Sequence, residues 1–449
     1  MYTEMKVEQI ISLLEDHKYK ELRSSLEAMN EVDIAVCFEE LKDKELAIAF
    51  RLIHKDLAAE VFANMNEQQQ GHLVSIFSEQ ELRELLEDLY VDDTVDMLED
   101  LPANLVTRVL EYVPPSKREI LNQILKYPDD SAGSLMTTEY VSLRLHMTVQ
   151  EAMTRIKRQG IHSETIYTLY VTNRRKLIGI VSAKDLMIAD DDVAIKDLME
   201  TEHEIISVTT HTDKEHVAEL FSKYDLLALP VLDVDGFLVG IVTVDDAMDV
   251  IIEEATEDIE RMAAINPSEK AYFETSVLEH AKNRVPWLLV LMLAATITGG
   301  IIARFEHALA TMVVLATFLP MLMNTGGNGG SQSSALIIRG LALGEVEFRD
   351  FFRVWFKEIR VALLVGIVLA IANGIRIAIM NHDVKLAIVV GLSLFCTLLL
   401  SKSIGCMLPL IAKKIGMDPA LMSAPFITTI VDACSVLIFF SIASAMFGL

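Results

Sequence analysis

The stretch that most constrains this chain runs from Phe318 to Ala342, where an apolar helical pattern meets four glycines in five residues: Gly326, Gly327, Gly329 and Gly330. Glycine is a poor helix former. Unwound backbone is tolerated in a bilayer only where protein buries it or where it lines a water-filled cavity. The stretch therefore predicts a broken membrane helix beside a pathway through the membrane.

A second anomaly lies about a hundred residues later. Asp432 is a lone carboxylate within the apolar segment SAPFITTIVDACSVLIFFSIASAMF. An ionisable group in mid-membrane is costly and marks a functional site by default. We expect Asp432 and the glycine segment to meet at a pore that the rest of the chain controls.

Hydropathy predicts five membrane spans, each long enough to cross the hydrocarbon core. They cover residues 285–303, 309–338 (with the glycine break), 361–380, 386–411 and 421–447. Basic residues gather before the first span and in the loops after the second and fourth, which by the positive-inside rule places the N-terminus in the cytosol and the C-terminus outside. No cleavable signal is apparent. We expect a multi-pass protein of the plasma membrane, the inner membrane of a bacterial cell.

Charge is split unevenly along the chain. The last 169 residues hold 13 Lys and Arg against 8 Asp and Glu, so the first 280 residues hold 26 against 57. Such a polyanion argues against nucleic acid as a partner, because phosphate contacts need a basic surface. It favours bound cations, although a merely solubilising surface remains an alternative. The four cysteines have no paired spacing and predict neither disulfides nor a thiolate metal site.

The chain divides into four predicted regions. Residues 1–130 repeat short amphipathic helices and predict an all-α superhelical domain. Residues 131–250 contain an α/β pattern that occurs twice, 251–280 form an acidic connecting helix region, and 281–449 form the all-α transmembrane pore domain. In the first region, Asp92, Asp93 and Asp96 place carboxylates on one helical face, and Glu60 lies on an earlier repeat. Taken alone, such a face is more often solvated.

The repeated pattern carries the motifs GIVSAKD (179–185) and GIVTVDD (240–246). It resembles a tandem CBS-domain pair, a regulatory module that commonly binds adenine nucleotides or cations. The resemblance implies that Ser182 and Thr243 cap the following helices and can face a ligand phosphate, while Asp185 and Asp246 can accept hydrogen bonds from ribose. ATP is therefore a possible ligand. A purely structural dimerisation module is the alternative.

The helix after Thr243 carries two acidic stripes. At 100° per residue, one face receives Asp246, Asp249, Glu253, Glu257 and Glu260, and a second receives Glu254 and Asp258. Like charges at this spacing destabilise a helix, and a divalent cation would relieve them. Further on, Asn266, Pro267 and Glu269 have the order of an N-cap, N1 and N3, and predict that the next helix starts there.

Five helices with one central carboxylate do not enclose a symmetric pathway alone, so we expect a homodimer. Two facing Asp432 carboxylates would bind a cation or take up a proton. Hydrated Mg²⁺ suits this place because it keeps its waters and needs only one or two carboxylates; Mn²⁺ and Co²⁺ remain open. The predicted pore-lining residues are Gly326, Gly327, Asn328, Gly330, Gln332 and Thr428.

The order of the regions, with the motifs LPMLMNTGGNGGSQ and DPALMSAPFITTIVDA, resembles the MgtE family of magnesium channels and transporters over essentially the whole chain. The resemblance implies a homodimeric, non-enzymatic Mg²⁺ channel whose spans two and five line the pore. It also implies that cytosolic Mg²⁺ binds between the N-domain, the CBS pair and the connecting helix and closes the gate. Ala424 stands where members of the family can carry Asn. The residues that match the family's metal positions are Glu60, Asp92, Asp96, Asp213, Glu215, Asp225, Asp246, Asp249, Glu254, Glu257, Asp258, Asp418 and, in the pore, Asp432.

Three other functions compete with this interpretation. A secondary transporter that couples divalent cations to H⁺ or Na⁺ stays open, because Asp432 could carry a proton. An anion pathway is disfavoured by Asp432 and by the lack of Lys or Arg in both motifs; Lys402 is the residue that could support it, and we expect it to snorkel to the cytosolic interface. A nucleotide-regulated membrane enzyme lacks any recognisable nucleophile or phosphate-binding motif.

Overall fold

The computed structural model describes residues 2–200, 205–268, 272–273, 275–422 and 424–448. The chain forms two compact units, Met1–Ile251 and Ile252–Leu449. The first contains the helical N-domain and the α/β pair, and the second contains the membrane helices. Each unit is described by itself.

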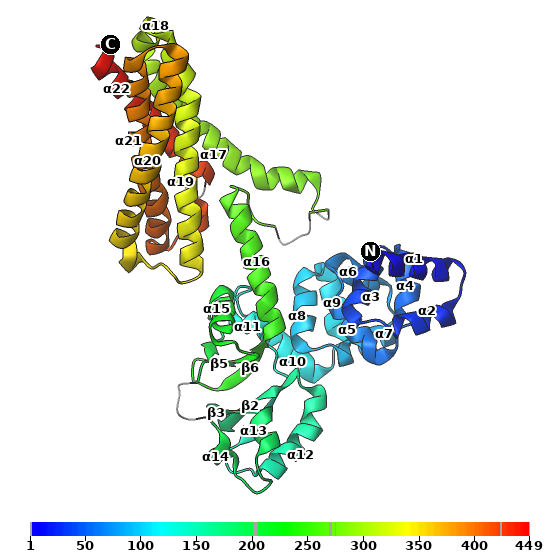
Figure 1. The fold of residues 1–449 in the computed structure, drawn as a ribbon. Coiled ribbons are helices and arrows are strands. Elements are labelled where there is room, and N and C mark those ends of the chain that lie inside the picture. Colours follow the sequence, from blue (N-terminus) through cyan, green and yellow to red (C-terminus); the bar gives the residue numbers. More distant parts are fainter. Residues whose placement is uncertain (1, 201–204, 269–271, 274, 423, 449) are drawn as a thin grey trace. The chain divides into compact units, whose positions relative to one another are not determined.

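The N-domain is a stack of short amphipathic helices, as the repeat predicts (Figure 1). Their boundaries follow local capping: Asn66 accepts a hydrogen bond from the Gln69 amide, and Ser78 with Glu81 forms a capping box. Leu, Ile, Val and Phe side chains of successive helices form one continuous buried core. The helices are α1 (Tyr2–Glu15), α2 (Tyr19–Leu26), α3 (Glu31–Glu39), α4 (Asp43–Phe50), α5 (Lys55–Ala63), α6 (Glu67–Ile76), α7 (Glu79–Asp88), α8 (Val91–Asp100), α9 (Ala103–Tyr112) and α10 (Pro115–Ile124).

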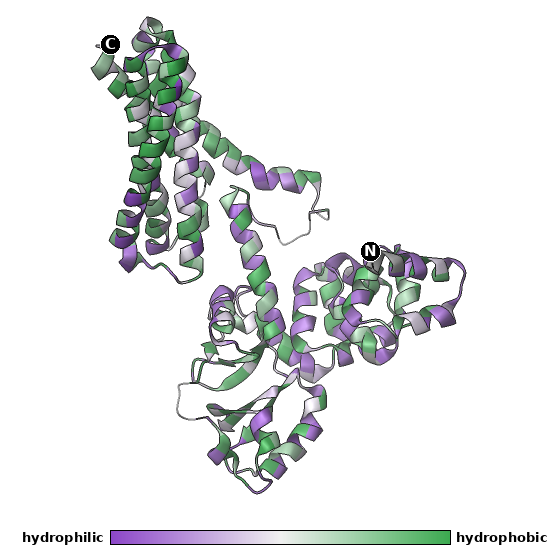
Figure 2. Cartoon of the chain, in the orientation of Figure 1, coloured by the Kyte–Doolittle hydropathy of each residue, from purple (hydrophilic) through white to green (hydrophobic). Residues whose placement is uncertain are grey.

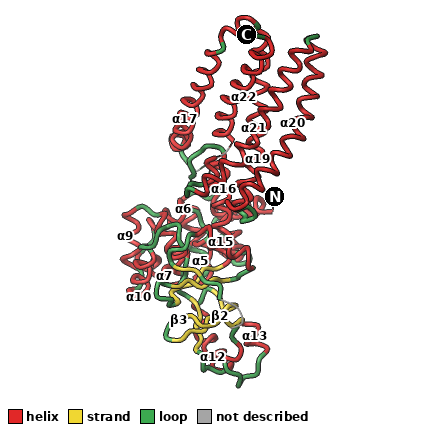
Figure 3. The backbone as a smooth tube through the Cα atoms, turned by 90° about the vertical axis from the view of Figure 1, so that its left-hand side faces the viewer, coloured by secondary structure: helices red, strands yellow, loops and turns green. Residues whose placement is uncertain are grey.

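Two small sheets follow, one for each predicted repeat (Figure 3). In the first, β1 (Tyr140–Arg144) pairs parallel with β2 (Thr165–Asn173), which pairs antiparallel with β3 (Lys176–Ser182). In the second, β4 (Val208–Thr209), β5 (Ala228–Leu232) and β6 (Leu238–Thr243) repeat that order. The helices between and beside the strands are α11 (Ala132–Leu135), α12 (Val149–Gln159), η1 (Gly160–His162), α13 (Ala183–Ile188), α14 (Ile195–Leu198) and α15 (Lys214–Tyr224).

Local sequence sets the turns of this pair, and the predicted cap at Ser182 forms. Arg174 and Arg175 have positive φ in the first hairpin, and Gly236 has a φ of 80° in the second. Ser182 accepts a hydrogen bond from the Asp185 amide and so caps α13. The Thr243 hydroxyl donates to Asp246 at the start of α16 (Val244–Met262) at 2.7 Å.

The helix predicted to start at Asn266 does not form there. The described residues 265–268 are non-helical, and Glu269 lies outside the described residues. The next helix, α17 (Val277–Arg304), begins eleven residues later, where Ser276 accepts from the Glu279 amide. Asn266 instead accepts a hydrogen bond from the Trp287 indole at 3.1 Å. Ser276 and Glu279 have the same spacing as the predicted cap, and they form it.

The C-terminal helices are strongly apolar over most of their length (Figure 2). Four helical segments of the described chain are long and apolar enough to span a membrane: Val277–Arg304, Phe348–Asn381, Val384–Lys414 and Pro419–Phe447. They contain α17, η3 (Phe348–Asp350) with α20 (Phe351–Asn381), α21 (Val384–Lys414), and η4 (Pro419–Met422) with α22 (Ala424–Phe447). The predicted second span differs, because residues 309–318 belong to α18 (Glu306–Thr311) and η2 (Val313–Phe318) and the long helix α19 (Leu319–Ala342) starts only afterwards.

The predicted glycine break is wrong. α19 is an uninterrupted α-helix through all four glycines. A Cβ added at Gly326 would meet Thr397 of α21 and Ser435 of α22 at 2.6 and 3.0 Å, and one at Gly327 would meet Thr428 at 2.7 Å. The glycines therefore let α21 and α22 approach the α19 backbone closely, as small residues do in membrane helix packing. A bilayer also favours the intact helix, since lipid cannot satisfy free backbone groups.

Candidate metal-binding and transport sites

The first candidate site is a cluster of carboxylates in unit 1, where α8 of the N-domain meets the second α/β repeat. Asp92 is buried, with 6% of its surface exposed, and Asp93 and Asp96 lie on the same helix. Asp245 and Asp246 come from the first turn of α16. Burial first, and then the charge of Asp246, raises the pKa of both Asp92 and Asp96, so the two helix segments bring their charges together.

Two glutamates that the sequence reasoning missed complete this cluster. Glu139 directly precedes β1 and Glu164 directly precedes β2. Tyr140 pairs with Thr165 in parallel register, so both glutamates reach the same edge of the sheet. Glu139 Oε2 accepts from the Val91 amide at 2.9 Å, which ties this edge to the start of α8. Glutamates placed directly before two parallel strands were the signal available in the sequence.

Burial and mutual repulsion raise the pKa values of the carboxylates in this cluster. Burial, followed by the charge of Asp246, raises the pKa of Asp96 to about 8, although its side chain keeps contact with solvent. Burial, followed by the charges of Asp93 and Asp245, raises the pKa of Glu164 to about 8. Burial also raises the pKa of Asp246 to about 7 and that of Asp93 to about 6. These carboxylates gain stability from any cation that joins them.

One base reaches the cluster from α10. The Lys117 ammonium donates to the Leu86 carbonyl at 3.1 Å and to the Leu89 carbonyl. Burial lowers the Lys117 pKa, while Glu139, Asp92 and Asp93 raise it. The Lys117 ammonium therefore makes part of its hydrogen bonds to the C-terminus of α7. Its single positive charge faces several carboxylates.

This cluster suits a hydrated cation better than a dehydrated one. Within the described ranges, no three His, Cys, Asp or Glu side chains stand close enough to hold a metal ion directly. Glu164 Oε2 is buried without a hydrogen-bond partner. Mg²⁺ usually keeps several waters and takes one or two carboxylates directly, so a cluster without three direct ligands suits hydrated Mg²⁺ better than a dehydrated ion.

The other predicted sensor residues lie at several places. Glu60, exposed on α5, faces the edge of the cluster, because it contributes with Asp92 to the raised pKa of Tyr90. Asp249 is one turn beyond Asp245, whose charge adds to burial in raising its pKa. Asp213 and Glu215 are exposed at the start of α15 and Asp225 caps its other end, so one chain does not bring these three together.

Within unit 2, the predicted ligands Glu257 and Asp418 meet through a base. Arg261, on the last turn of α16, forms ion pairs with both carboxylates. Asp418 also accepts from the Ala420 amide at 2.7 Å. Glu254 and Asp258 share this end of α16. Arg261 thus occupies the position between Glu257 and Asp418 that the sequence assigns to a metal.

A cavity of about 960 Å³ lies between the two α/β repeats. Thr168 and Ile180 line it from the first repeat, and Thr209, His216 and Asp225 line it from the second. The predicted nucleotide residues Ser182, Asp185, Thr243 and Asp246 are not among its lining residues. Ser182 and Thr243 spend their hydroxyls on Asp185 and Asp246, and Asp246 belongs to the acidic cluster.

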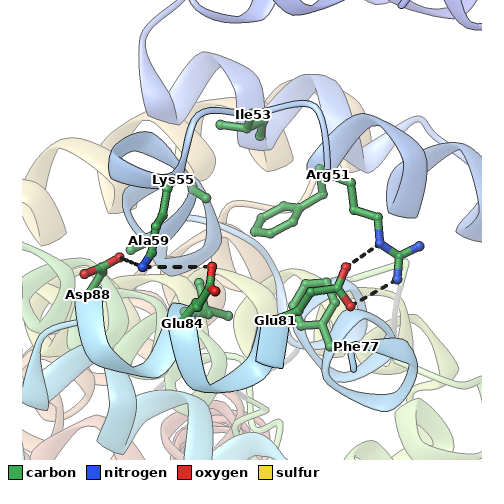
Figure 4. Close-up of a pocket in the computed structure, with 11 residues that line it drawn as sticks. Arg51, Ile53, Lys55, Ala59, Phe77, Glu81, Glu84 and Asp88 are labelled. Atoms are coloured by element: carbon green, nitrogen blue, oxygen red, sulfur yellow. Dashed lines mark hydrogen bonds and ion pairs between the residues drawn. The ribbon is translucent and has the colours of Figure 1, made fainter. Parts of the chain in front are cut away.

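The N-domain holds a smaller pocket of about 280 Å³ on its surface (Figure 4). Arg51 pairs with Glu81 at 2.7 Å, and Lys55 lies between Glu84 and Asp88 at 3.9 and 3.8 Å. The Arg51 guanidinium lowers the pKa of Glu81 to about 2. The charges of this pocket are compensated by its own residues, unlike those of the acidic cluster.

The membrane domain presents a polar stripe on the face of α19 that no other helix of this unit covers. Asn324, Asn328 and Gln332 are exposed at four-residue spacing, and the Asn328 amide donates to Asn324 at 3.1 Å. Gly326, Gly327 and Gly330, predicted to line the pore, are buried against α21 and α22 instead.

Asp432 lies at the level of the α19 glycines. Its neighbours in α22, Val431 and Ser435, pack on Gly326, and Thr428, one turn away, packs on Gly327. Asp432 itself is half-buried. The sequence prediction that this acid meets the glycine segment is consistent with the packing, although the segment is helical.

Comparison with known proteins agrees with this architecture. The family model for MgtE, described as a divalent cation transporter, matches residues 319–442; the MgtE intracellular N domain matches 29–130; and the CBS domain matches 132–192 and 195–253. Magnesium transporter MgtE of Thermus thermophilus is 39% identical over 337 residues, 75% of this chain and 74% of the relative. Magnesium transporter MgtE of Bacillus subtilis is 40% identical with the same coverage.

Two solved structures cover the first half of the chain. The cytosolic domain of the Mg²⁺ channel MgtE in complex with ATP is 35% identical, with a TM-score of 0.52 over 54% of this chain and 99% of that one. The soluble part of a magnesium transporter is 31% identical, with a TM-score of 0.52 over 56% and 99%. The family models together match most of the chain, and each of the two magnesium transporter relatives is matched over about three quarters of its own length. This chain belongs to the MgtE family of magnesium transporters.

Proposed function

We propose that this protein is a homodimeric Mg²⁺ channel of the plasma membrane, with α19 and α22 lining the pore and Asp432 holding the hydrated ion. The observation that carries the proposal is the polar stripe of Asn324, Asn328 and Gln332 on the open face of α19, on the helix whose glycines pack against the α22 segment that contains Asp432. Amide oxygens and a carboxylate can hold the waters of an ion that dehydrates reluctantly.

The stripe also supports the dimer. Polar side chains in a membrane domain face a partner, the bundle interior or a water-filled cavity, because hydrocarbon cannot bond them. A second copy related by twofold symmetry would place the same stripe opposite. The two stripes and the two Asp432 side chains would then enclose the pathway.

Negative feedback is the proposed regulation. Mg²⁺ that accumulates in the cytosol joins the carboxylates of α8, the Glu139–Glu164 edge and α16, and the joined state closes the pore. Two unit charges at 4 Å interact by about 4 kcal/mol at an effective dielectric near 20. A few such contacts match the roughly 5.5 kcal/mol that carries a two-state gate from mostly open to mostly closed.

ATP is the proposed second ligand, in the cavity between the α/β repeats. A solved relative with the same domains is a complex with ATP. The cavity of about 960 Å³ offers Thr209 and Thr212 hydroxyls and the His216 ring. This differs from the four residues expected from the CBS motifs.

The test of transport is Mg²⁺ flux into liposomes that contain the purified full-length protein. Wild type should admit Mg²⁺ down its gradient, and Asp432→Ala should reduce the flux by at least about tenfold, since the ion loses one nearby charge. Glu306→Gln, which removes an exposed carboxylate at the end of the same domain, is the matched control. Equal flux through wild type and Asp432→Ala would contradict the proposal. Flux that requires a proton or sodium gradient would assign a coupled transporter.

A further inference from the structure

A charged pair is buried in the membrane domain away from Asp432. Lys402 of α21 has 5% of its surface exposed, and Glu358 of α20 has 8%. The expectation that Lys402 snorkels to the interface is therefore wrong. A charge buried among membrane helices is costly, so such a pair is kept for a function.

Ser333 of α19 joins the two charges. Its hydroxyl donates to Glu358 Oε2 at 2.6 Å, and the Lys402 ammonium donates to the same hydroxyl at 3.2 Å. Lys402 also reaches Glu358 Oε2 at 3.9 Å and the Gly329 carbonyl at 3.5 Å. Lys402, Glu358 and Ser333 thus form a polar node in which three helices meet.

The bare backbone of α19 makes this node possible. Gly405 of α21 packs so closely that an added Cβ would meet the Gly330 carbonyl oxygen at 2.2 Å. Ser401, the residue before Lys402, donates to the Gly326 carbonyl. Because the glycines have no side chains, their carbonyls can accept additional hydrogen bonds from α21. One of these hydrogen bonds comes from the Lys402 ammonium.

The node and the polar stripe lie on different faces of α19. Gly329 and Ser333 directly follow Asn328 and Gln332 in sequence, so the two sets lie about 100° apart around the same turns of α19. A helix with its side chains is about 10 to 12 Å across. A net charge on the node would therefore act on an ion held at the stripe over about 10 Å or less.

We propose that Glu358 is a specificity-determining residue that cancels the charge of Lys402, so that divalent cations can pass along α19. The inference rests on the proposed pore face. Without Glu358, the Lys402 ammonium, which donates to Ser333 and to the Gly329 carbonyl, has no counter-charge and repels Mg²⁺ at the stripe. Without Lys402, the only charge left at the node is the negative charge of Glu358, which does not repel a cation.

The effect of the two charges is therefore asymmetric. One unit charge acting on a divalent ion at about 10 Å, at an effective dielectric near 20, changes ion occupancy by roughly a hundredfold. A purely structural ion pair behaves differently, because the loss of either partner strands the other and destabilises the fold. The two accounts thus predict different rankings of the same variants.

The experiment compares Mg²⁺ flux through wild type, Glu358→Gln, Lys402→Met and the double variant, each as full-length protein in liposomes at equal, verified incorporation. Gln keeps the acceptor for Ser333 and removes only the charge. We expect Glu358→Gln to lower the flux by at least about tenfold and to raise the Mg²⁺ concentration for half-maximal flux. Lys402→Met should stay within about threefold of wild type, and the double variant should recover to the level of Lys402→Met.

Three controls separate the possible failures. Lys385→Met removes an exposed charge from the start of α21 and should leave the flux unchanged. Lys402→Arg keeps the charge and should retain flux. Wild type without any Mg²⁺ flux would reject the proposed function itself. With wild-type flux present, the inference is overturned by an unimpaired Glu358→Gln, by a double variant as poor as Glu358→Gln, or by a tenfold loss in Lys402→Met. The Lys402→Met arm decides the matter even if Glu358→Gln does not fold.

Discussion

The acidic cluster of unit 1 and the polar node of unit 2 both contain buried carboxylates, but only in the node does each carboxylate have its own base. In the cluster, several acids share the single Lys117 ammonium. Glu358 has Lys402 at 3.9 Å and a Ser333 hydroxyl at 2.6 Å. Asp92, Asp96 and Glu164 face other acids instead, and Glu164 Oε2 is buried without a partner. A buried carboxylate with a tethered cation is a fixed part of the fold, whereas one without such a cation responds to the ions around it.

The largest expected effect is stabilisation of the acidic cluster by Mg²⁺. A ligand at a thousand times its dissociation constant stabilises the form that binds it by about 4 kcal/mol. Mg²⁺ should therefore slow amide hydrogen exchange in α8 and the first turns of α16 of the full-length protein, while α20 and α21 stay unchanged. Asp246→Asn should remove most of this protection. Equal protection of both units by Mg²⁺ would break the comparison.

The pH dependence should be the next largest effect. The carboxylates of Asp96 and Glu164 have pKa values raised to about 8, and that of Asp246 is raised to about 7, all above their unfolded values. The folded state therefore binds more protons than the unfolded state between about pH 4 and pH 8, and stability falls as pH rises through that window.

Without Mg²⁺, we expect the cytosolic unfolding transition to lie about 6 °C lower at pH 8 than at pH 6, on the scale of 2 to 4 °C per kcal/mol for a unit of this size. Saturating Mg²⁺ should shrink the difference, because the ion replaces the protons. Differential scanning calorimetry of the full chain in detergent measures both. A transition that rises with pH in the absence of Mg²⁺ would contradict the raised pKa values.

Packing at the membrane node should have a moderate effect. Gly405→Ala places a methyl group against the Gly330 carbonyl, and overpacking of this kind costs about 1 to 3 kcal/mol. Thermal unfolding of the membrane domain should shift down accordingly. Gly299→Ala is the matched control, since nothing lies within 4 Å of the added Cβ. Equal unfolding temperatures for the two variants would contradict the close packing of α21 against α19.

The smallest expected effect concerns the exposed ion pair of the N-domain pocket. Arg51 and Glu81 are about 46% and 36% exposed, and exposed pairs contribute about 0 to 1 kcal/mol. Arg51→Ala should therefore change the unfolding free energy by less than about 1 kcal/mol in denaturant titrations. A much larger loss of unfolding free energy would show that this exposed pair contributes to stability as a buried pair does.

Much of the fold could be predicted from the sequence because its signals are local. The cap at Ser182, the turn at Gly236 and the apolar length of α20, α21 and α22 each depend on a few neighbouring residues. The prediction that a helix starts at Asn266 is wrong, because Ser276, at the same spacing from a glutamate, forms the cap instead.

The parts that could not be predicted depend on contacts between distant segments. Four glycines look like a break in isolation, and only the approach of Thr397 and Thr428 shows that they are a packing surface. Glu139 and Glu164 join the acidic cluster because β1 and β2 pair in parallel. Lys402 looks like a snorkelling residue until Glu358, 44 positions earlier, is placed beside it.

The central claim is that the clustered acids of unit 1, which outnumber Lys117, sense Mg²⁺ and close the pore. The most direct measurement is single-channel recording from inside-out patches while Mg²⁺ on the cytosolic face is raised, with wild type and with the Asp96→Asn, Glu164→Gln and Asp246→Asn triple variant. The account predicts that Mg²⁺ silences wild type and leaves the triple variant open. Inhibition of the triple variant at the wild-type concentration would contradict it.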